Sequence, residues 1–176
     1  MKFLTGVFAS VLLILGTVIC AQLSYALNFL ELTGRIFDKA QLLDSTQEES
    51  LSAQLEAHEE KTSNQVVVTI PGLEGYAIAD YANRLGRAWQ IGTVKNNNGV
   101  LLLIAPAYRK VRIEVGYGLE GALTDSISRI IIQCEILPAF RDNDYPLGIN
   151  RGVSAIIAAV DDRILCVNKP FCPTWQ

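Results

Sequence analysis

Two acidic residues lie in and beside one glycine-rich loop, where their oxygens could bind a metal ion. The stretch GYGLEGALTD, residues 116–125, holds Glu120 inside the loop and Asp125 just after it. Calcium and magnesium take carboxylate and carbonyl oxygens as ligands, and glycines let a loop turn its carbonyls inward without steric cost. One interpretation is therefore a divalent-cation site. The other is that Asp125 caps the helix that follows, and both interpretations stay open.

The same loop has the spacing G-x-G-x-x-G, starting at Gly116, that is found in dinucleotide-binding folds. In those folds an acid about 20 residues further on binds the ribose, within a strand–helix–strand unit. Asp142 and Asp144 have that spacing, but no strand pattern follows the helix, and Glu120 would face the pyrophosphate. The sequence context therefore excludes a dinucleotide.

Other polar candidates are few. Arg141 precedes the oxygen-rich turn Asp142–Asn143–Asp144, where it could meet an anion, although such a turn is usually only a surface feature. Arg109 and Arg112 are interpreted as solvated charges at turns. His58, the single histidine, is expected to be exposed and inert on a charged helix. Without G-x-S-x-G or a partner for this histidine, hydrolysis of the serine type is unsupported.

The first residues have the pattern of an export signal. Lys2 is followed by an uncharged apolar run, and Ser24 and Ala26 supply the small residues before a cleavage site. Residues 1–26 are expected to be a signal peptide or, if uncleaved, an anchor, because residues 3–23 are long enough to span a bilayer. Either alternative places the rest outside the cytoplasm, in a periplasmic, lumenal or secreted location.

Charge and cysteines limit the partners and the compartment. The net charge of −3, without a long basic run, argues against a nucleic-acid partner. In an oxidising compartment, Cys166 and Cys172 are expected to form a disulfide in the tail, residues 161–176. Cys134 lies in an apolar segment and is interpreted as a buried thiol.

The apolar patterns predict alternating strands and helices after an ordered entry segment over residues 27–43, in which Gly34 marks a turn. The capping-box pattern Ser45-x-x-Glu48 predicts a helix that runs to about Thr62. Three strands and three further helices follow, with one helix ending before Pro138. The strands are expected at 65–70, 100–105 and 111–115, and the helices at 76–89, 125–137 and 145 to about 165.

This order predicts a single α/β domain: a sandwich with a small mixed central sheet flanked by helices. The first two strands are expected to be parallel, joined by a right-handed crossover. The third strand follows a tight turn and is expected to be antiparallel to the second.

Several segments in order resemble the TPM domain family over residues 33–160. They include FDKAQLLD, NNNGVLLLIAPAYRKVRIEVGYGLEGALTD and ILPAFRDNDYPLGINRGV. The family contains exported bacterial proteins and a thylakoid-lumen member linked to photosystem II repair. The resemblance implies an α/β sandwich, a site for a divalent cation (Ca²⁺ or Mg²⁺) and, for the lumenal relatives, an acid phosphatase activity.

The resemblance also assigns residues. The metal ligands carry over onto Asp38, Glu120 and Asp125, and the catalytic pair onto Arg141 and Asp144. Two functions follow. The first is an accessory or repair-type factor that binds a membrane-protein partner and uses the ion to stiffen its loops. The alternative is a metal-dependent phosphatase for a phosphorylated substrate, in which Arg141 grips the phosphate and Asp144 orients water.

Overall fold

The computed structural model describes residues 31–59 and 64–161, all within the compact unit that spans Glu31–Gln176. Within that part of the chain, no helix combines the length and the apolar character that crossing a membrane requires. The leader expected over residues 1–26 and the Cys166–Cys172 pair both lie outside the described residues.

The described elements alternate between strands and helices, as the apolar patterns predict. Short 3₁₀ segments (η2 and η3) flank the last strand, and a π-helical segment (η4) joins two of the helices. In chain order the elements are β1 (Ile36–Asp38), α2 (Ser45–Glu59), β2 (Asn64–Thr69), α3 (Ile78–Ala88), β3 (Gly99–Ala105), η2 (Pro106–Tyr108), β4 (Lys110–Val115), η3 (Tyr117–Leu119), α4 (Asp125–Ile131), η4 (Ile132–Ile136), α5 (Leu137–Arg141) and α6 (Tyr145–Val160).

The sheet is mixed and has the strand order β1-β2-β3-β4. β1, β2 and β3 are parallel, and β4 is antiparallel to β3, which confirms the predicted directions. Asp38 pairs with Thr69 at the carboxyl edge of the parallel strands, whereas Val100 pairs with Val115 near the opposite, amino edge. β1 lies in the predicted ordered entry segment, where no strand was assigned, because three residues are too few to show an alternating pattern.

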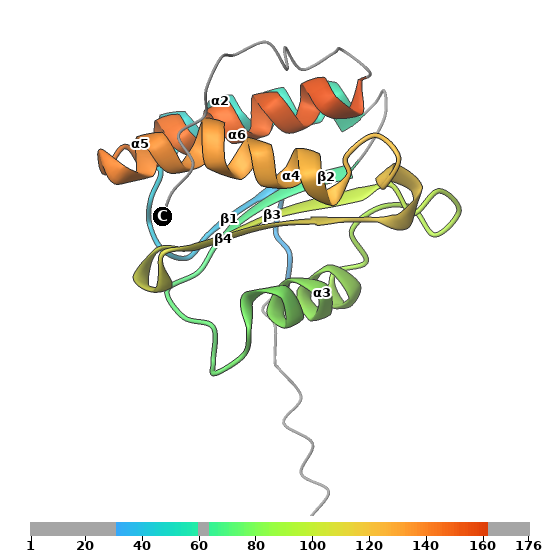
Figure 1. Ribbon diagram of the computed structural model, residues 1–176, viewed down its shortest axis with the longest axis horizontal. Helices are drawn as coiled ribbons and strands as arrows, with labels where there is room; N and C mark the ends of the chain where they lie inside the picture. Colours follow the sequence, from blue (N-terminus) through green and yellow to red (C-terminus); the bar gives the residue numbers. More distant parts are fainter. Residues whose placement is uncertain (1–30, 60–63, 162–176) are drawn as a thin grey trace, which may run out of the picture. The chain divides into compact units, whose positions relative to one another are not determined.

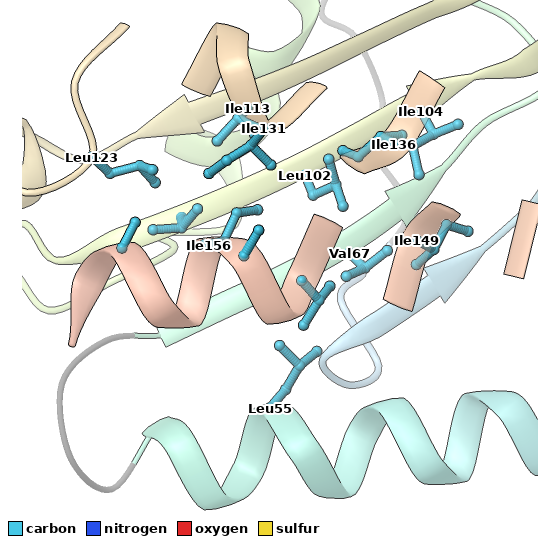
Figure 2. Close-up of a cluster of buried hydrophobic side chains, with 14 of the residues drawn as sticks. Leu55, Val67, Leu102, Ile104, Ile113, Leu123, Ile131, Ile136, Ile149 and Ile156 are labelled. Atoms are coloured by element: carbon cyan, nitrogen blue, oxygen red, sulfur yellow. The ribbon is translucent and has the colours of Figure 1, made fainter. Parts of the chain in front are cut away.

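Helices cover both faces of the sheet (Figure 1). α2, α4 and α6 pack on one face, where Leu102 and Ile113 belong to the largest apolar cluster. Figure 2 shows this cluster, with Leu55 of α2 directed toward α6 and the sheet. α3 packs on the other face, against β3 and β4. Because successive strand residues face opposite sides, β3 is buried along its whole length, and each fully buried Leu or Ile stabilises the fold by about 1.5–3 kcal/mol.

α2 begins with a capping box one residue earlier than predicted. Asp44 Oδ1 accepts a hydrogen bond from Gln47 N at 2.8 Å, and Gln47 Oε1 accepts one from Asp44 N at 3.0 Å. The predicted pair, Ser45 and Glu48, lies inside the helix instead. Aspartate accepts backbone hydrogen bonds as well as serine does, so both patterns fit the sequence, and the structure uses the acidic one.

The helix predicted to end before Pro138 continues past it. Proline has no N–H to donate, and its ring collides with the carbonyl one turn earlier. The π-helical segment Ile132–Ile136 widens the backbone directly before Pro138, which then lies in the first turn of α5. The chain therefore reaches Arg141, at the far end of α5, without leaving the helical path.

Candidate functional site

The glycine-rich loop after β4 packs against the loop before β3. Gly116 N donates to Gly99 O at 2.7 Å, and Gly118 N donates to Asn97 O at 3.0 Å. A β-carbon on Gly116 would overlap the carbonyl oxygen of Asn97, and one on Gly118 would overlap that of Asn96. Close contact between two backbones therefore accounts for the first two glycines of the G-x-G-x-x-G spacing.

The three residues predicted to bind a divalent cation do not come together. Asp38 lies at the carboxyl edge of the parallel strands. Glu120 and Asp125 follow the end of β4, which lies at the opposite edge. Residues 31–59 and 64–161 contain no group of three or more His, Cys, Asp or Glu side chains arranged to hold a metal ion. Strand direction separates Asp38 from Glu120 and Asp125, because the antiparallel strand β4 returns the chain to the amino edge of the sheet.

The half-buried carboxylate of Asp38 organises the chain around it. Its Oδ2 accepts a hydrogen bond from Leu43 N at 2.8 Å, and its Oδ1 accepts one from the hydroxyl of Thr69. The same hydroxyl oxygen accepts a hydrogen bond from Ala40 N at 3.0 Å. Asp38 thus holds the turn between β1 and α2 against the end of β2.

Two other predicted site residues lie at helix starts. Thr124, not Asp125, caps α4, because its Oγ1 accepts a hydrogen bond from Ile127 N at 3.3 Å. Asp144 caps α6, where its Oδ1 accepts a hydrogen bond from Leu147 N at 3.1 Å. The interpretation of Asp125 as the cap was therefore off by one residue.

A cavity of about 470 Å³ lies at the carboxyl edge of β3. We call it the basic cavity, because three basic side chains line it: Arg109, Lys110 and Arg141. Arg109 and Lys110 come from the turn between β3 and β4, and Arg141 comes from the end of α5. No acidic side chain is found among the described residues that line it. Its other lining residues are Ile104, Pro106, Val111, Leu137, Phe140, Asn143 and Tyr145.

Two lining residues of the basic cavity have a left-handed backbone. Arg109 has φ 52°, and Asn143 has φ 59°. Asparagine adopts this conformation readily, but arginine does so rarely. Strained positions of this kind concentrate at functional sites. The turn that carries Asn143 is also held by the packing of Phe140 against Tyr145, whose ring centroids are 4.9 Å apart.

A second cavity of about 540 Å³ lies at the amino edge, between α3 and the ends of β3 and β4. Glu120 lines this cavity, as do Arg87 and Tyr117. We call it the α3 cavity. Arg141 and Glu120, two of the five predicted site residues, therefore line different cavities at opposite edges of the sheet.

Two further expectations change with the structure. His58 is buried, with 5% of its side chain exposed, and its Nδ1 lies 3.6 Å from Asp161 Oδ1. The helical pattern of α2 did not reveal this, because the covering helix α6 is distant in sequence.

Cys134 is disulfide-bonded and is not the free thiol that its apolar surroundings suggested. Its partner lies outside the described residues.

Sequence reasoning missed the participation of Arg109 and Lys110. Arg109 was interpreted as a solvated turn charge and Lys110 was given no role, because nothing in a linear sequence places the turn at 106–110 beside the end of α5. The available signal was the position of the basic residues. Arg109 and Lys110 directly precede Val111, and Arg141 directly precedes Asp142.

The comparison with protein families identifies the domain. The family model for the TPM domain, which carries the name TPM_phosphatase, matches residues 36–159. This range lies within residues 33–160, over which the sequence resembles the family. None of the curated proteins compared with the chain matches it.

Solved structures share this fold. The N-terminal domain of a P. gingivalis protein has a TM-score of 0.65 and 38% identity, covering 75% of this chain and 85% of that domain. The BA42 protein of Bizionia argentinensis has a TM-score of 0.59 and 18% identity, covering 68% of this chain and 82% of its own. An N-terminal domain from Corynebacterium glutamicum has a TM-score of 0.55 and 13% identity, covering 78% of this chain and 86% of that domain. The latter two similarities concern the fold alone. On the family match, the chain belongs to the TPM domain family.

Proposed function

We propose that this TPM domain is a binding module that recognises a phosphate-type anion in the basic cavity. The observation that carries the proposal is that Arg109 and Lys110, from the turn between β3 and β4, and Arg141, from the end of α5, line one cavity. Basic side chains gathered at one cavity attract an anion and disfavour a cation. An anionic ligand therefore fits this cavity better than a cation does.

The position and chemistry of the cavity support this ligand. In open α/β sheets, ligands bind outside the carboxyl ends of the parallel strands, and the basic cavity lies there. An arginine side chain offers two parallel N–H donors that match two oxygens of a phosphate. Asn143 and Tyr145 add side chains that can donate hydrogen bonds to the remaining oxygens.

Binding is favoured over catalysis because two of the predicted carboxylates, Asp38 and Asp144, already hold the chain through hydrogen bonds. Asp38 accepts hydrogen bonds from Leu43 N and Thr69, and Asp144 accepts one from Leu147 N. This proposal keeps the accessory role that the sequence suggests and replaces the divalent cation by an anion as the principal ligand.

The proposed location is outside the cytoplasm, in the service of membrane or envelope proteins. The disulfide at Cys134 supports this location, since disulfides persist in oxidising compartments and are rare in the cytosol. The apolar leader expected from the sequence supports the same placement.

Titration of the purified protein with inorganic phosphate and glycerol phosphate, followed by backbone amide NMR, tests the proposal. We expect shifts to concentrate at residues 106–111 and 140–145. Because a charge-assisted hydrogen bond is worth about 1.5–3 kcal/mol, Arg141→Gln should weaken binding about tenfold or more. Lys110→Gln should weaken it less, since lysine acts as a point charge.

The matched control is Arg129→Gln, which removes an exposed arginine of α4 that does not line the basic cavity. It should bind phosphate as the wild type does. Shifts spread over the whole surface, or equal affinity in Arg129→Gln and Arg141→Gln, would contradict the proposal.

Hydrolysis of a phosphomonoester is the second candidate function. The same three basic side chains favour it, as does the name of the matching family model. Release of phosphate from glycerol phosphate, measured with and without calcium or magnesium, separates the two functions. Turnover that Arg141→Gln abolishes would establish the enzyme, whereas binding without turnover would establish the module.

A further inference from the structure

We infer that the α3 cavity is a docking site for an extended polypeptide segment of a partner protein. The inference concerns a different site from the basic cavity and stands whether or not that cavity binds phosphate. The α3 cavity is formed by α3, the loop at residues 90–97 and the glycine-rich loop after β4. Backbone hydrogen bonds from Gly116 and Gly118 join the glycine-rich loop to the chain at Asn97 and Gly99.

Gly86 leaves a space beside α3 that a larger side chain would fill. Glycine is less favourable in a helix than any residue except proline. Such a residue is usually explained by a neighbour that leaves no room for a side chain, but a β-carbon on Gly86 would meet no atom of the described structure within 4 Å. Gly86 lines the α3 cavity. A ligand that lies against the helix would use the space that an alanine would fill.

The rim carries exposed apolar and aromatic groups. Tyr117 is 80% exposed and Val94 is 92% exposed, and both line the cavity. The loops with which antibodies bind proteins are rich in tyrosine, which offers a large rigid contact area, and in asparagine and glycine, which provide adaptable hydrogen bonding. The α3 cavity has this composition, with Asn83 and Asn97 among its lining residues.

The charges at the cavity favour a polypeptide over a neutral sugar. Arg87 comes from α3, and Glu120 comes from the loop after β4. Both line the cavity, and within the described ranges no hydrogen bond or ion pair engages either charge. By contrast, Glu114 is already paired with Arg112 at 3.0 Å. A polypeptide segment with one acidic and one basic side chain would complement both free charges.

Selection from a library of short random peptides displayed on phage tests the inference. The full-length wild-type protein is the bait, and peptides that bind the Gly86→Leu variant are removed first. We expect the enriched peptides to combine an acidic and a basic residue with an apolar one. Gly86→Leu should weaken the binding of the enriched peptides, made synthetically, about tenfold or more, because the leucine side chain fills the space beside the helix. Glu120→Gln should remove the preference for the basic residue.

Ala79→Leu is the matched control, because it places the same leucine side chain at an exposed position of α3 that does not line the cavity. It should bind the peptides as the wild type does. Gly86→Ala is a second test in case Gly86→Leu does not fold. The melting temperature of Gly86→Ala should rise, because alanine favours the helix, whereas its affinity for the peptides should fall.

Three outcomes would overturn the inference. They are the absence of any enriched peptide, equal peptide affinity in the wild type and Gly86→Ala, and a dimer of the wild type that Gly86→Leu abolishes in sedimentation. The last outcome would show that a second copy of the chain occupies the cavity.

Discussion

At Gly116 and Gly118 the backbone approaches two carbonyl groups so closely that only a hydrogen atom fits on the Cα. Such close packing joins the loop after β4 to the loop before β3, which together form one wall of the α3 cavity. Gly121, the third glycine of the same spacing, has open space around it. At the scale of single residues, the spacing G-x-G-x-x-G therefore has two structural glycines and one that packing does not require.

Alanine substitutions at these glycines should differ sharply. Gly118→Ala introduces a β-carbon that overlaps the carbonyl of Asn96, and overpacking of this kind typically costs about 1–3 kcal/mol. Gly121→Ala meets no neighbour within 4 Å and should change the free energy of unfolding by less than about 0.5 kcal/mol. Urea denaturation measures both values. Equal stability of the two variants would contradict the packing described at Gly118.

At the scale of elements, side-chain caps decide where three of the helices begin. Asp44 at α2, Thr124 at α4 and Asp144 at α6 each accept a hydrogen bond from a backbone N–H of the first turn. The first N–H groups of a helix lack partners within the helix, so each cap satisfies a donor that would otherwise depend on water. Acidic residues that resemble catalytic groups in a sequence can therefore serve the backbone.

Removal of the α2 cap should destabilise the domain measurably. Asp44→Ala removes the side-chain oxygen that accepts the hydrogen bond from Gln47 N and should lower the free energy of unfolding by about 1 kcal/mol. Ser45→Ala, one residue later, should have an effect within about 0.5 kcal/mol, because it lies inside the helix. Guanidinium denaturation compares the two variants. A larger loss in Ser45→Ala would restore the capping box predicted from Ser45 and Glu48.

At the scale of the whole molecule, the two faces of the sheet are covered unequally. α2, α4 and α6 share one face, and α3 covers the other (Figure 1). Tyr81 of α3 is buried, with 7% exposed. Burial raises the pKa of Tyr81 above its ordinary 10.0, and the negative charge of Glu74 raises this pKa further. Because small domains unfold cooperatively, ionisation of this residue affects the stability of the entire domain.

The domain should lose stability at alkaline pH through Tyr81. Its folded pKa is higher than its unfolded pKa of 10.0, so the unfolded state releases the proton first. Stability is fully present below pH 10 and is lost as the pH rises toward the folded pKa. Tyr81→Phe should flatten this loss when the free energy of unfolding is measured from pH 8 to pH 12. An unchanged slope in Tyr81→Phe would show that other groups cause the alkaline loss.

Much of the fold could be predicted because local patterns carry it. The β-branched run at residues 65–70 and the apolar run at 100–105 are buried strands in the structure. The turn before Lys110 correctly predicts an antiparallel β4. The predictions that were wrong concern segments in which neighbouring elements override the local sequence preference. β1 is stabilised by pairing with β2, and the helix passes Pro138 because the π-helical segment before it accommodates the ring.

Less of the candidate site than of the fold could be predicted from the sequence. Residue types alone predicted that Arg141 could meet an anion, since the chemistry of a guanidinium does not depend on context. Which residues share a site with it depends on strand direction and on how far the helices reach. Only the tertiary structure separates Asp38 from Glu120, by sending β4 back across the sheet. It also brings Arg109 and Lys110 to Arg141, because a helical path that starts after the amino edge ends at the carboxyl edge.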